Sequence, residues 1–338
     1  MPTRRTSWIP CLFLLLAAAC SKEPDLVVYC SLDQEFAEPL ILRFARETGL
    51  DVHAEFDIEA AKTVGLVARL REEARNPRCD VFWNNEIAHT AQLGADGLLE
   101  AYDSPSAADI PAGFRDPGRR WTGFAARARV LIVNTDLAEP ASITSMWDLL
   151  DPRWTGKGVM AKPLTGTTLT HMAALYSVLG EDKAGEYLTR VHELSKTGAV
   201  NLTNGNASVA RLVADGQLAF GWTDSDDFAV ALERGAHVAA VYPDAQGCGT
   251  LFLPNSIALL KGAPHAAAAR RFIDWVLRPE IERELAFSRS AQIPVRDSVA
   301  RPAGVAAPGQ FKAMAVDYGR IGQEVERCAA SFRKLFVD

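Results

Sequence analysis

Short apolar runs alternate with amphipathic stretches along this chain, and this alternation constrains the fold more than any other feature. Residues 26–30 are apolar and rich in β-formers, and in residues 34–48 apolar side chains recur at helical spacing. Most connections between such stretches are short. The pattern therefore predicts an α/β fold, with mostly parallel sheets flanked by helices.

The same reasoning places the remaining elements. Further strands are expected at residues 51–56, 80–83, 129–134, 158–161, 200–202, 218–222, 237–242 and 250–260. Further helices are expected at residues 59–75, 146–150, 168–179, 183–194, 207–214, 226–233, 264–277, 281–288 and 314–336.

The first twenty residues have the order of a bacterial export signal. Arg4 and Arg5 precede an apolar run and three small residues, and Cys20 follows them. The run is shorter than the roughly 20 apolar residues that span a bilayer. We expect residues 1–19 to be removed, Cys20 to carry a lipid, and residues 20–25 to form a polar tether. The alternative is an ordinary secretory signal that happens to contain a cysteine.

Length predicts two lobes, because the chain has 338 residues and exceeds what one hydrophobic core normally serves. Lobe 1 is expected to comprise residues 26–126 with about 250–300, and lobe 2 about 127–249 with about 301–338. Extended crossovers near residues 125–129 and 249–252 would join the lobes and form a hinge.

Charge and motifs exclude several functions. Loss of Arg4 and Arg5 with the signal reduces 36 basic residues to 34 against 42 acidic ones, a formal charge of −8. Such a protein is a poor candidate for binding nucleic acid. The sequence has no Gly-x-Ser-x-Gly, no His-Glu-x-x-His and no P-loop, so an exported enzyme is the weaker hypothesis.

Four cysteines remain after the lipidated one. Cys30, Cys79, Cys248 and Cys328 lack the close paired spacing of a zinc site, and their even number in an exported protein suggests disulfides. A bond between Cys248 and Cys328 is the pairing we favour. Buried free thiols are the alternative.

Polar segments follow the expected strands, although the strands themselves are apolar. In sheets of this kind, ligands bind beyond the carboxyl ends of the strands. The segments are 31–34, 58–63, 84–86, 164–168, 204–206 and 223–227. Their shared position predicts a binding cleft.

Three carboxylates within four residues follow the strand that ends near Trp222. Asp224, Asp226 and Asp227 would repel one another unless a cation compensates them. A hard cation such as Fe3+ or a ligand amine would do so. Alternatively, Asp224 or Ser225 caps the next helix and the other acids stabilise its first turn.

The cleft is expected to be mixed in charge. Thr165, Gly166 and Thr167 open a helix and would present N–H groups to an anion, or form only a turn and cap. Lys62 and Arg127 are further anion partners, although Lys62 also fits a solvated helix face.

These segments, in this order, resemble the periplasmic ferric-iron-binding family of ABC transporter solute-binding proteins. The resemblance runs from Val27 to about Leu335 and includes the stretches 80–86, 97–99, 127–130, 163–167 and 206–216. It implies a two-lobed type II periplasmic-binding fold, an ABC permease and its ATPase as partners, and a monomer on the periplasmic side of the membrane. A sensor subunit is an alternative role for the same cleft.

The resemblance also suggests ligands. Where family members often have a histidine, a glutamate and two tyrosines, this chain has Asp33, Asn85, Asp226 and Asp227, and Glu86 lies one residue beyond the glutamate position. The implied cargo is Fe3+ with a bound anion, and the alternative is a zwitterionic or phosphorylated organic molecule. The metal candidates are Asp33, Glu86, Asp226 and Asp227. All ligand-binding candidates are Ser31, Asp33, Lys62, Asn84, Asn85, Glu86, Arg127, Thr165, Gly166, Thr167, Asn206, Asp224, Ser225, Asp226 and Asp227.

Overall fold

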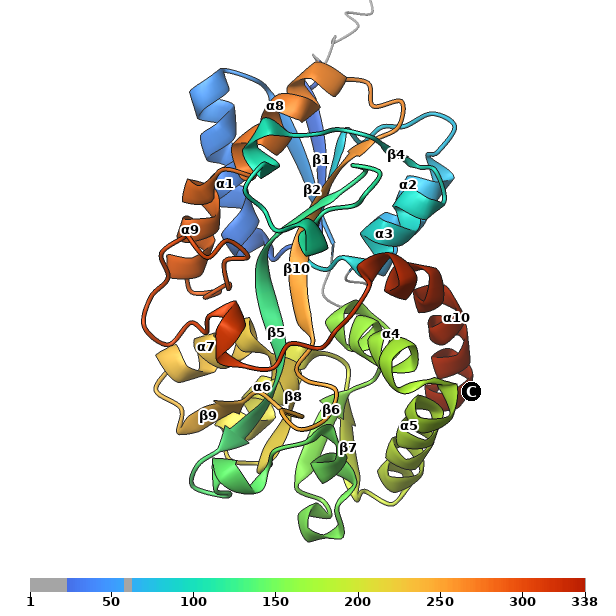
Figure 1. Ribbon diagram of the computed structural model, residues 1–338, viewed down its shortest axis with the longest axis vertical. Helices are drawn as coiled ribbons and strands as arrows, with labels where there is room; N and C mark the ends of the chain where they lie inside the picture. The colour runs from blue at the N-terminus through green and yellow to red at the C-terminus, as the bar shows by residue number, and fades with distance from the viewer. Residues whose placement is uncertain (1–22, 58–62, 338) are drawn as a thin grey trace, which may run out of the picture.

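A computed structural model of the protein describes residues 23–57 and 63–337. The expected signal, Cys20 and Lys62 lie outside these residues. Within the described residues, ten strands form one sheet, in which eight follow the order β2-β1-β3-β10-β5-β8-β6-β7, while β4 pairs with β10 and β9 with β5. Helices cover both halves of it, and the molecule is elongated with an upper and a lower lobe (Figure 1).

The upper lobe contains the first half-sheet. Its strands are β1 (Leu26–Cys30), β2 (Val52–Phe56), β3 (Val81–Asn84), β4 (Leu99–Glu100) and β10 (Phe252–Leu260). Strands β1, β2 and β3 are parallel, whereas β10 is antiparallel to β3. The helices are α1 (Gln34–Thr48), α2 (Val64–Glu72), α3 (Ala88–Ala95), α8 (Ala266–Val276) and α9 (Pro279–Phe287).

The lower lobe contains the second half-sheet. Its strands are β6 (Gly158–Ala161), β7 (Val200–Thr203), β8 (Phe220–Asp224) and β9 (Val238–Val241), of which β6 is parallel to β7 and β8. Its helices are α4 (Gly166–Leu179), α5 (Glu181–Lys196), α6 (Asn206–Ala214) and α7 (Ser225–Glu233). Residues 146–150, expected as a short helix, form a 3-10 helix.

Strand β5 (Thr122–Asn134) joins the two half-sheets and is buried along its whole length. Its first part pairs with β10 and its second part with β8 and β9. The sequence pattern predicted only residues 129–134, because small residues around Ala125 weaken the strand signal. Both β5 and β10 run from lobe to lobe (Figure 1), where the crossovers were expected.

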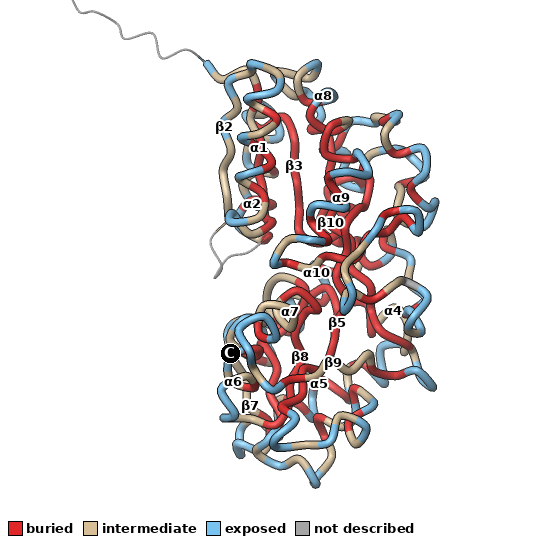
Figure 2. The backbone as a smooth tube through the Cα atoms, turned by 90° about the vertical axis from the view of Figure 1, so that its left-hand side faces the viewer, coloured by how far each residue is buried: buried red, intermediate tan, exposed pale blue. Residues whose placement is uncertain are grey.

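The amphipathic patterns are explained by burial. In α1, Ala37, Leu40, Ile41 and Phe44 face the core, and Gly49 ends the helix in the left-handed conformation at φ 71°. The tube in Figure 2 shows buried backbone at β3, β5, β8 and β10, whereas β2 at the sheet edge is less buried. Among the described residues, no helix has the length and apolar character needed to cross a membrane.

The last helix, α10 (Tyr318–Phe336), spans the two lobes. Near its start, Tyr318 donates a hydrogen bond to the Phe252 carbonyl oxygen at 2.6 Å in the upper lobe. Near its end, Phe332 packs on Tyr176 of α4, with ring centroids 5.6 Å apart. The expected assignment of residues 301–338 to lobe 2 stays a prediction, because α10 contacts both lobes.

The favoured disulfide between Cys248 and Cys328 is wrong for this structure, where both residues carry free thiols. Cys328 lies on the buried face of α10, whereas Cys248 lies in the loop that precedes β10. The buried-thiol alternative therefore holds for Cys328. Burial raises the pKa of its thiol to about 11, which keeps it protonated near neutral pH.

Candidate ligand-binding site

The polar segments after the strands of both lobes enclose one small cavity of about 50 Å³. The upper lobe contributes Asp33, after β1, and Asn85, after β3. The lower lobe contributes residues after β6, β7 and β8, namely Lys162, Thr165–Thr168, Asn204–Ala207, Asp224, Asp226 and Asp227. Arg127 of the crossing strand β5 completes the lining. The expected convergence of strand ends on one cleft is therefore present.

The cavity continues into a wider groove of about 500 Å³. Cavity and groove share Asp33, Ala207, Asp226 and Asp227. The groove runs along α6 and α7 and reaches Phe36 at the start of α1. A ligand bound in the cavity can therefore extend into the groove.

Three helices of the lower lobe begin at or beside the cavity. These are α4 at Gly166, α6 at Asn206 and α7 at Ser225. Gly166 has φ 56°, a left-handed conformation that glycine adopts without strain. The first N–H groups of a helix lack intrahelical partners and carry partial positive charge. The starts of α4 and α6 therefore favour an anionic group.

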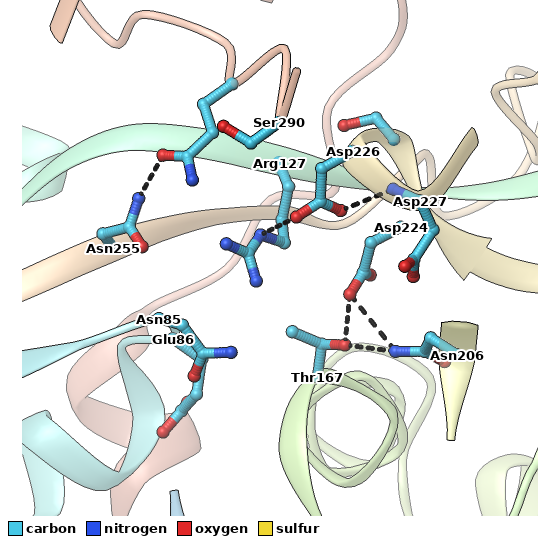
Figure 3. Close-up of polar contacts among 12 residues, drawn as sticks. Asn85, Glu86, Arg127, Thr167, Asn206, Asp224, Asp226, Asp227, Asn255 and Ser290 are labelled. Atoms are coloured by element: carbon cyan, nitrogen blue, oxygen red, sulfur yellow. Dashed lines mark hydrogen bonds and ion pairs between the residues drawn. The ribbon is translucent and has the colours of Figure 1, made fainter. Parts of the chain in front are cut away.

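Asp224 is held in a buried network behind these helix starts. Its carboxylate accepts hydrogen bonds from Arg129 Nη1 at 2.7 Å, Thr167 Oγ1 at 2.6 Å and Asn206 Nδ2 at 3.2 Å. Figure 3 shows Thr167 and Asn206 directed at Asp224. Within the described segments, Asp224 makes no side-chain capping hydrogen bond to α7. Asp224 therefore occupies the N-cap position of α7 without capping it through its side chain, whereas Asp226 and Asp227 lie in the first turn, as the alternative expected.

Arg127 lies at the centre of the acidic residues with only 2% of its surface exposed. Its Nε lies 3.3 Å from Asp226 Oδ2, so these two cavity-lining residues form an ion pair (Figure 3). Yet Nε and Nη2 form no hydrogen bond with any described residue. Burial acts to lower the pKa of Arg127, but Asp226, Asp224, Asp33 and Asp227 outweigh it and raise the pKa. The guanidinium therefore stays charged.

The three aspartates of the β8–α7 junction lie together. Carboxylate oxygens of Asp224, Asp226 and Asp227 lie within 4.8 Å of one another, a grouping that suits a metal ion. Asp227 also accepts a hydrogen bond from Thr223 Oγ1 at 2.9 Å. Arg129 and Arg127 already supply positive charge to Asp224 and Asp226, respectively.

Four of the expected residues do not line the cavity. Ser31 donates to Asp57 at 3.1 Å, and the Ser225 hydroxyl accepts from the Ala128 N–H at 3.1 Å. Asn84 is buried and donates to Glu86 Oε1 at 3.0 Å. A fifth, Lys62, lies outside the described residues.

Glu86, the fourth, is fully buried, and its acceptor capacity is used within the protein. It receives hydrogen bonds from the N–H groups of Ala88 and His89 at 2.6 and 3.1 Å, and from Thr170 Oγ1 of α4 at 3.0 Å. Burial acts to raise the pKa of Glu86, but His89 and these N–H donors lower it. Glu86 thus links the lobes through α3 and α4, one residue away from the cavity-lining Asn85.

Sequence reasoning missed Arg129 and Lys162. Lys162 directly follows β6 and lines the cavity. Arg129 is fully buried and pairs with Asp224. The available signal was two arginines, two positions apart, within an otherwise apolar strand.

Two half-sheets whose strand ends enclose one polar cavity define a two-lobed binding protein. A model of the family described as bacterial extracellular solute-binding protein matches residues 40–313, and this chain belongs to that family. The expected family resemblance and type II two-lobed fold are confirmed.

The similarity to known proteins extends over most of the chain. The major ferric iron-binding protein of Neisseria meningitidis is 26% identical over 300 residues, which are 85% of this chain and 86% of that protein. The ferric binding protein from Campylobacter jejuni superposes with a TM-score of 0.81 at 21% identity, over 92% of this chain and 99% of that one. The periplasmic binding protein AfuA from Actinobacillus pleuropneumoniae, with exogenous fructose-6-phosphate bound, gives a TM-score of 0.78 at 25% identity over 91% and 97%. These proteins are binding proteins and not enzymes.

Proposed function

We propose that this chain is the solute-binding subunit of an ABC importer and that it carries a small organic ligand with an anionic group. A phosphate, a phosphonate or a carboxylate is the group that the cavity suits. The ligand would bind in the cavity through this group, and its remaining part would extend into the groove beside α6 and α7.

The observation that carries this proposal is the state of Arg127. It is a buried cation whose Nε and Nη2 find no hydrogen-bond acceptor among the described residues, and it lines the same cavity as the starts of α4 and α6. Unsatisfied buried donors are costly, and an acidic group would satisfy them with strong charge-assisted hydrogen bonds. AfuA, with fructose-6-phosphate bound, is a precedent for a phosphorylated organic ligand on this fold.

Ferric iron with a bound anion is the second candidate. The grouping of Asp224, Asp226 and Asp227 favours it, as do the names of the iron-binding relatives. Against it, Arg129 and Arg127 lie 2.7 and 3.3 Å from two of these carboxylates, where they would repel a trivalent cation. The residues also lack the tyrosine pair that the iron-binding family often uses.

Calorimetry on refolded, ligand-free protein tests the organic-anion proposal. Organic phosphates, phosphonates and carboxylates would be titrated into the protein, with ferric citrate in parallel. Arg127→Met should weaken binding of the best organic anion by about 10- to 100-fold, the value of a hydrogen bond to a charged group. Arg127→Lys keeps the charge but loses the paired donors, and should fall in between.

The matched control is Arg190→Met on the exposed surface of α5, which should bind like the unmodified protein. Circular dichroism would establish that each variant is folded. Tight binding of ferric citrate with no response to any organic anion would contradict the proposal.

Anchoring through a lipid on Cys20 is a further part of the proposal, supported by the small residues that precede this cysteine. Cells fed a labelled fatty acid should incorporate the label into this protein, and Cys20→Ser should abolish it. Labelling of the variant at the original level would refute lipidation at Cys20. Permease and ATPase genes beside this gene would favour import over a sensory role.

A further inference from the structure

One edge of the Arg127 guanidinium has two hydrogen-bond donors without acceptors. Nε and Nη2 point in parallel from the same edge of this planar group, and the described residues offer neither a hydrogen bond. Asp226 Oδ2 approaches Nε to 3.3 Å without satisfying it. Two oxygens of a phosphate, phosphonate or carboxylate match such an edge with two parallel hydrogen bonds.

The walls around this edge are acidic. Among the described lining residues, Asp33, Asp226 and Asp227 outnumber the basic Arg127 and Lys162, even when Asp224 is set aside because it pairs with Arg129. A ligand that brought only negative charge would bind against this excess of carboxylates. A ligand that also brought a positive charge would complement both parts of the cavity.

Binding at the Arg127 edge also changes the ion pair with Asp226. An acidic group on Nε and Nη2 competes with Asp226 for the same guanidinium. Asp226 is 8% exposed, and a carboxylate at that depth is destabilised when a second anion binds the same arginine. A ligand amine beside Asp226 would offset the repulsion between this carboxylate and the acidic group of the ligand.

We infer that the ligand is a zwitterion, with its anionic group on Arg127 and its amine on Asp226 and Asp227. This inference rests on the organic anion of the proposed function and names its class. The acidic group and the amine of the ligand are separated by a short spacer. Asp226 contacts Arg127 and also belongs to the cluster that contains Asp227, so the two binding positions are close together. The amine end faces the groove, which shares Asp226 and Asp227 with the cavity.

Two probes isolate the amine. 2-Aminoethylphosphonate and ethylphosphonate have the same anionic group and chain, and only the first carries an amine. In calorimetry on the unmodified, ligand-free protein, the amine compound should bind about 10- to 100-fold more tightly, as expected for a charge-assisted contact. Equal affinity would overturn the inference but leave the organic anion of the proposed function intact.

Asp226→Asn should reduce this preference several-fold, chiefly through weaker binding of the amine compound. Asp227→Asn serves as a second variant if Asp226→Asn does not fold. Asp182→Asn, an exposed acid on α5, is the matched control and should keep the full preference. An undiminished preference in both cleft variants would overturn the assignment of the amine to these residues. Failure of both probes to bind the unmodified protein would contradict the inference, and the Arg127 variants would still test the proposed function with other anions.

Discussion

Arg127 and Arg129 lie two positions apart on β5, so both side chains leave the same face of the strand. They nevertheless have different roles. Arg129 directs Nη1 at Asp224 and Thr167, which holds the β8 end against the start of α4, and only its Nε lacks an acceptor among the described residues. Arg127 lines the cavity, and its Nε and Nη2 have no hydrogen-bond acceptor among the described residues. At the residue scale, one arginine therefore builds the site and the other is available to a ligand.

His171 provides a pH test of this buried region. It is 2% exposed, packs edge-on against Trp222 at 4.8 Å between ring centroids, and has a pKa well below 6.5 because of burial and the nearby charge of Arg129. Below pH 6.5, His171 therefore binds a proton in the unfolded chain but stays neutral in the folded chain until the pH falls much further. Folding stability should fall as pH drops, by up to about 1.4 kcal/mol per pH unit from this residue.

Urea unfolding at pH 7.5, 6.5 and 5.5 would measure this loss. Other histidines titrate in the same range, so the comparison is with His171→Leu, which should lose less stability on acidification than the unmodified protein. Parallel curves for the two proteins would show that His171 titrates normally in the folded state.

At the scale of elements, α10 fastens the lobes together behind the cleft. Its first half packs on α3 so closely that a Cβ on Gly322 would lie 2.7 Å from the Ala88 carbonyl oxygen and 2.8 Å from the Gln92 nitrogen. Its second half contacts the lower lobe, where Arg327 pairs with Glu181 at 3.1 Å. The Glu86–Thr170 hydrogen bond connects α3 and α4 on the same side. This helix therefore limits how the lobes can move.

Gly322→Ala should destabilise the protein by about 1–3 kcal/mol, because backbone atoms of α3 must move to admit a methyl group. Gly185→Ala on α5 is a matched control, since its Cβ would meet only Tyr176 Oη at 3.6 Å. The control should stabilise slightly, by about 0.5–1 kcal/mol, because alanine is the better helix former. Thermal and urea unfolding of both variants would compare them, and similar effects of the same sign would contradict the tight α3–α10 contact.

The elements also show what the sequence could predict. Strand β6 at 158–161 was predicted to the residue, because a short apolar run bounded by turn residues carries its own signal. The length of β5 was not predicted, because its first half depends on pairing with β10, more than 120 residues away. The polar strand ends were identifiable as a site because each follows its own strand in the sequence. The pairing of Arg129 with Asp224 was not predicted, because it joins residues that are far apart in the sequence.

For the whole molecule, the relevant property is the small volume of the cavity compared with that of the groove beside it. A cavity of about 50 Å³ has room for a few water-sized molecules, whereas an organic ligand must also use the groove. We predict that ligand entry is accompanied by a separation of the lobes about β5 and β10, the two long strands that cross between them.

Small-angle X-ray scattering tests this movement. Ligand-free protein should have a larger radius of gyration than the same protein saturated with its ligand. Titration of the best organic anion should shift the scattering curve from one form to the other. Identical curves across the titration, with binding established by calorimetry, would show that the cleft does not close by a hinge motion.

The identity of the molecule carried in the cleft tests the account most directly. Native mass spectrometry combined with elemental analysis, on protein purified from its own cells, would identify that molecule. We predict one organic mass with an acidic group and an amine, and no stoichiometric metal. One iron per protein chain, with no organic mass bound, would contradict the account.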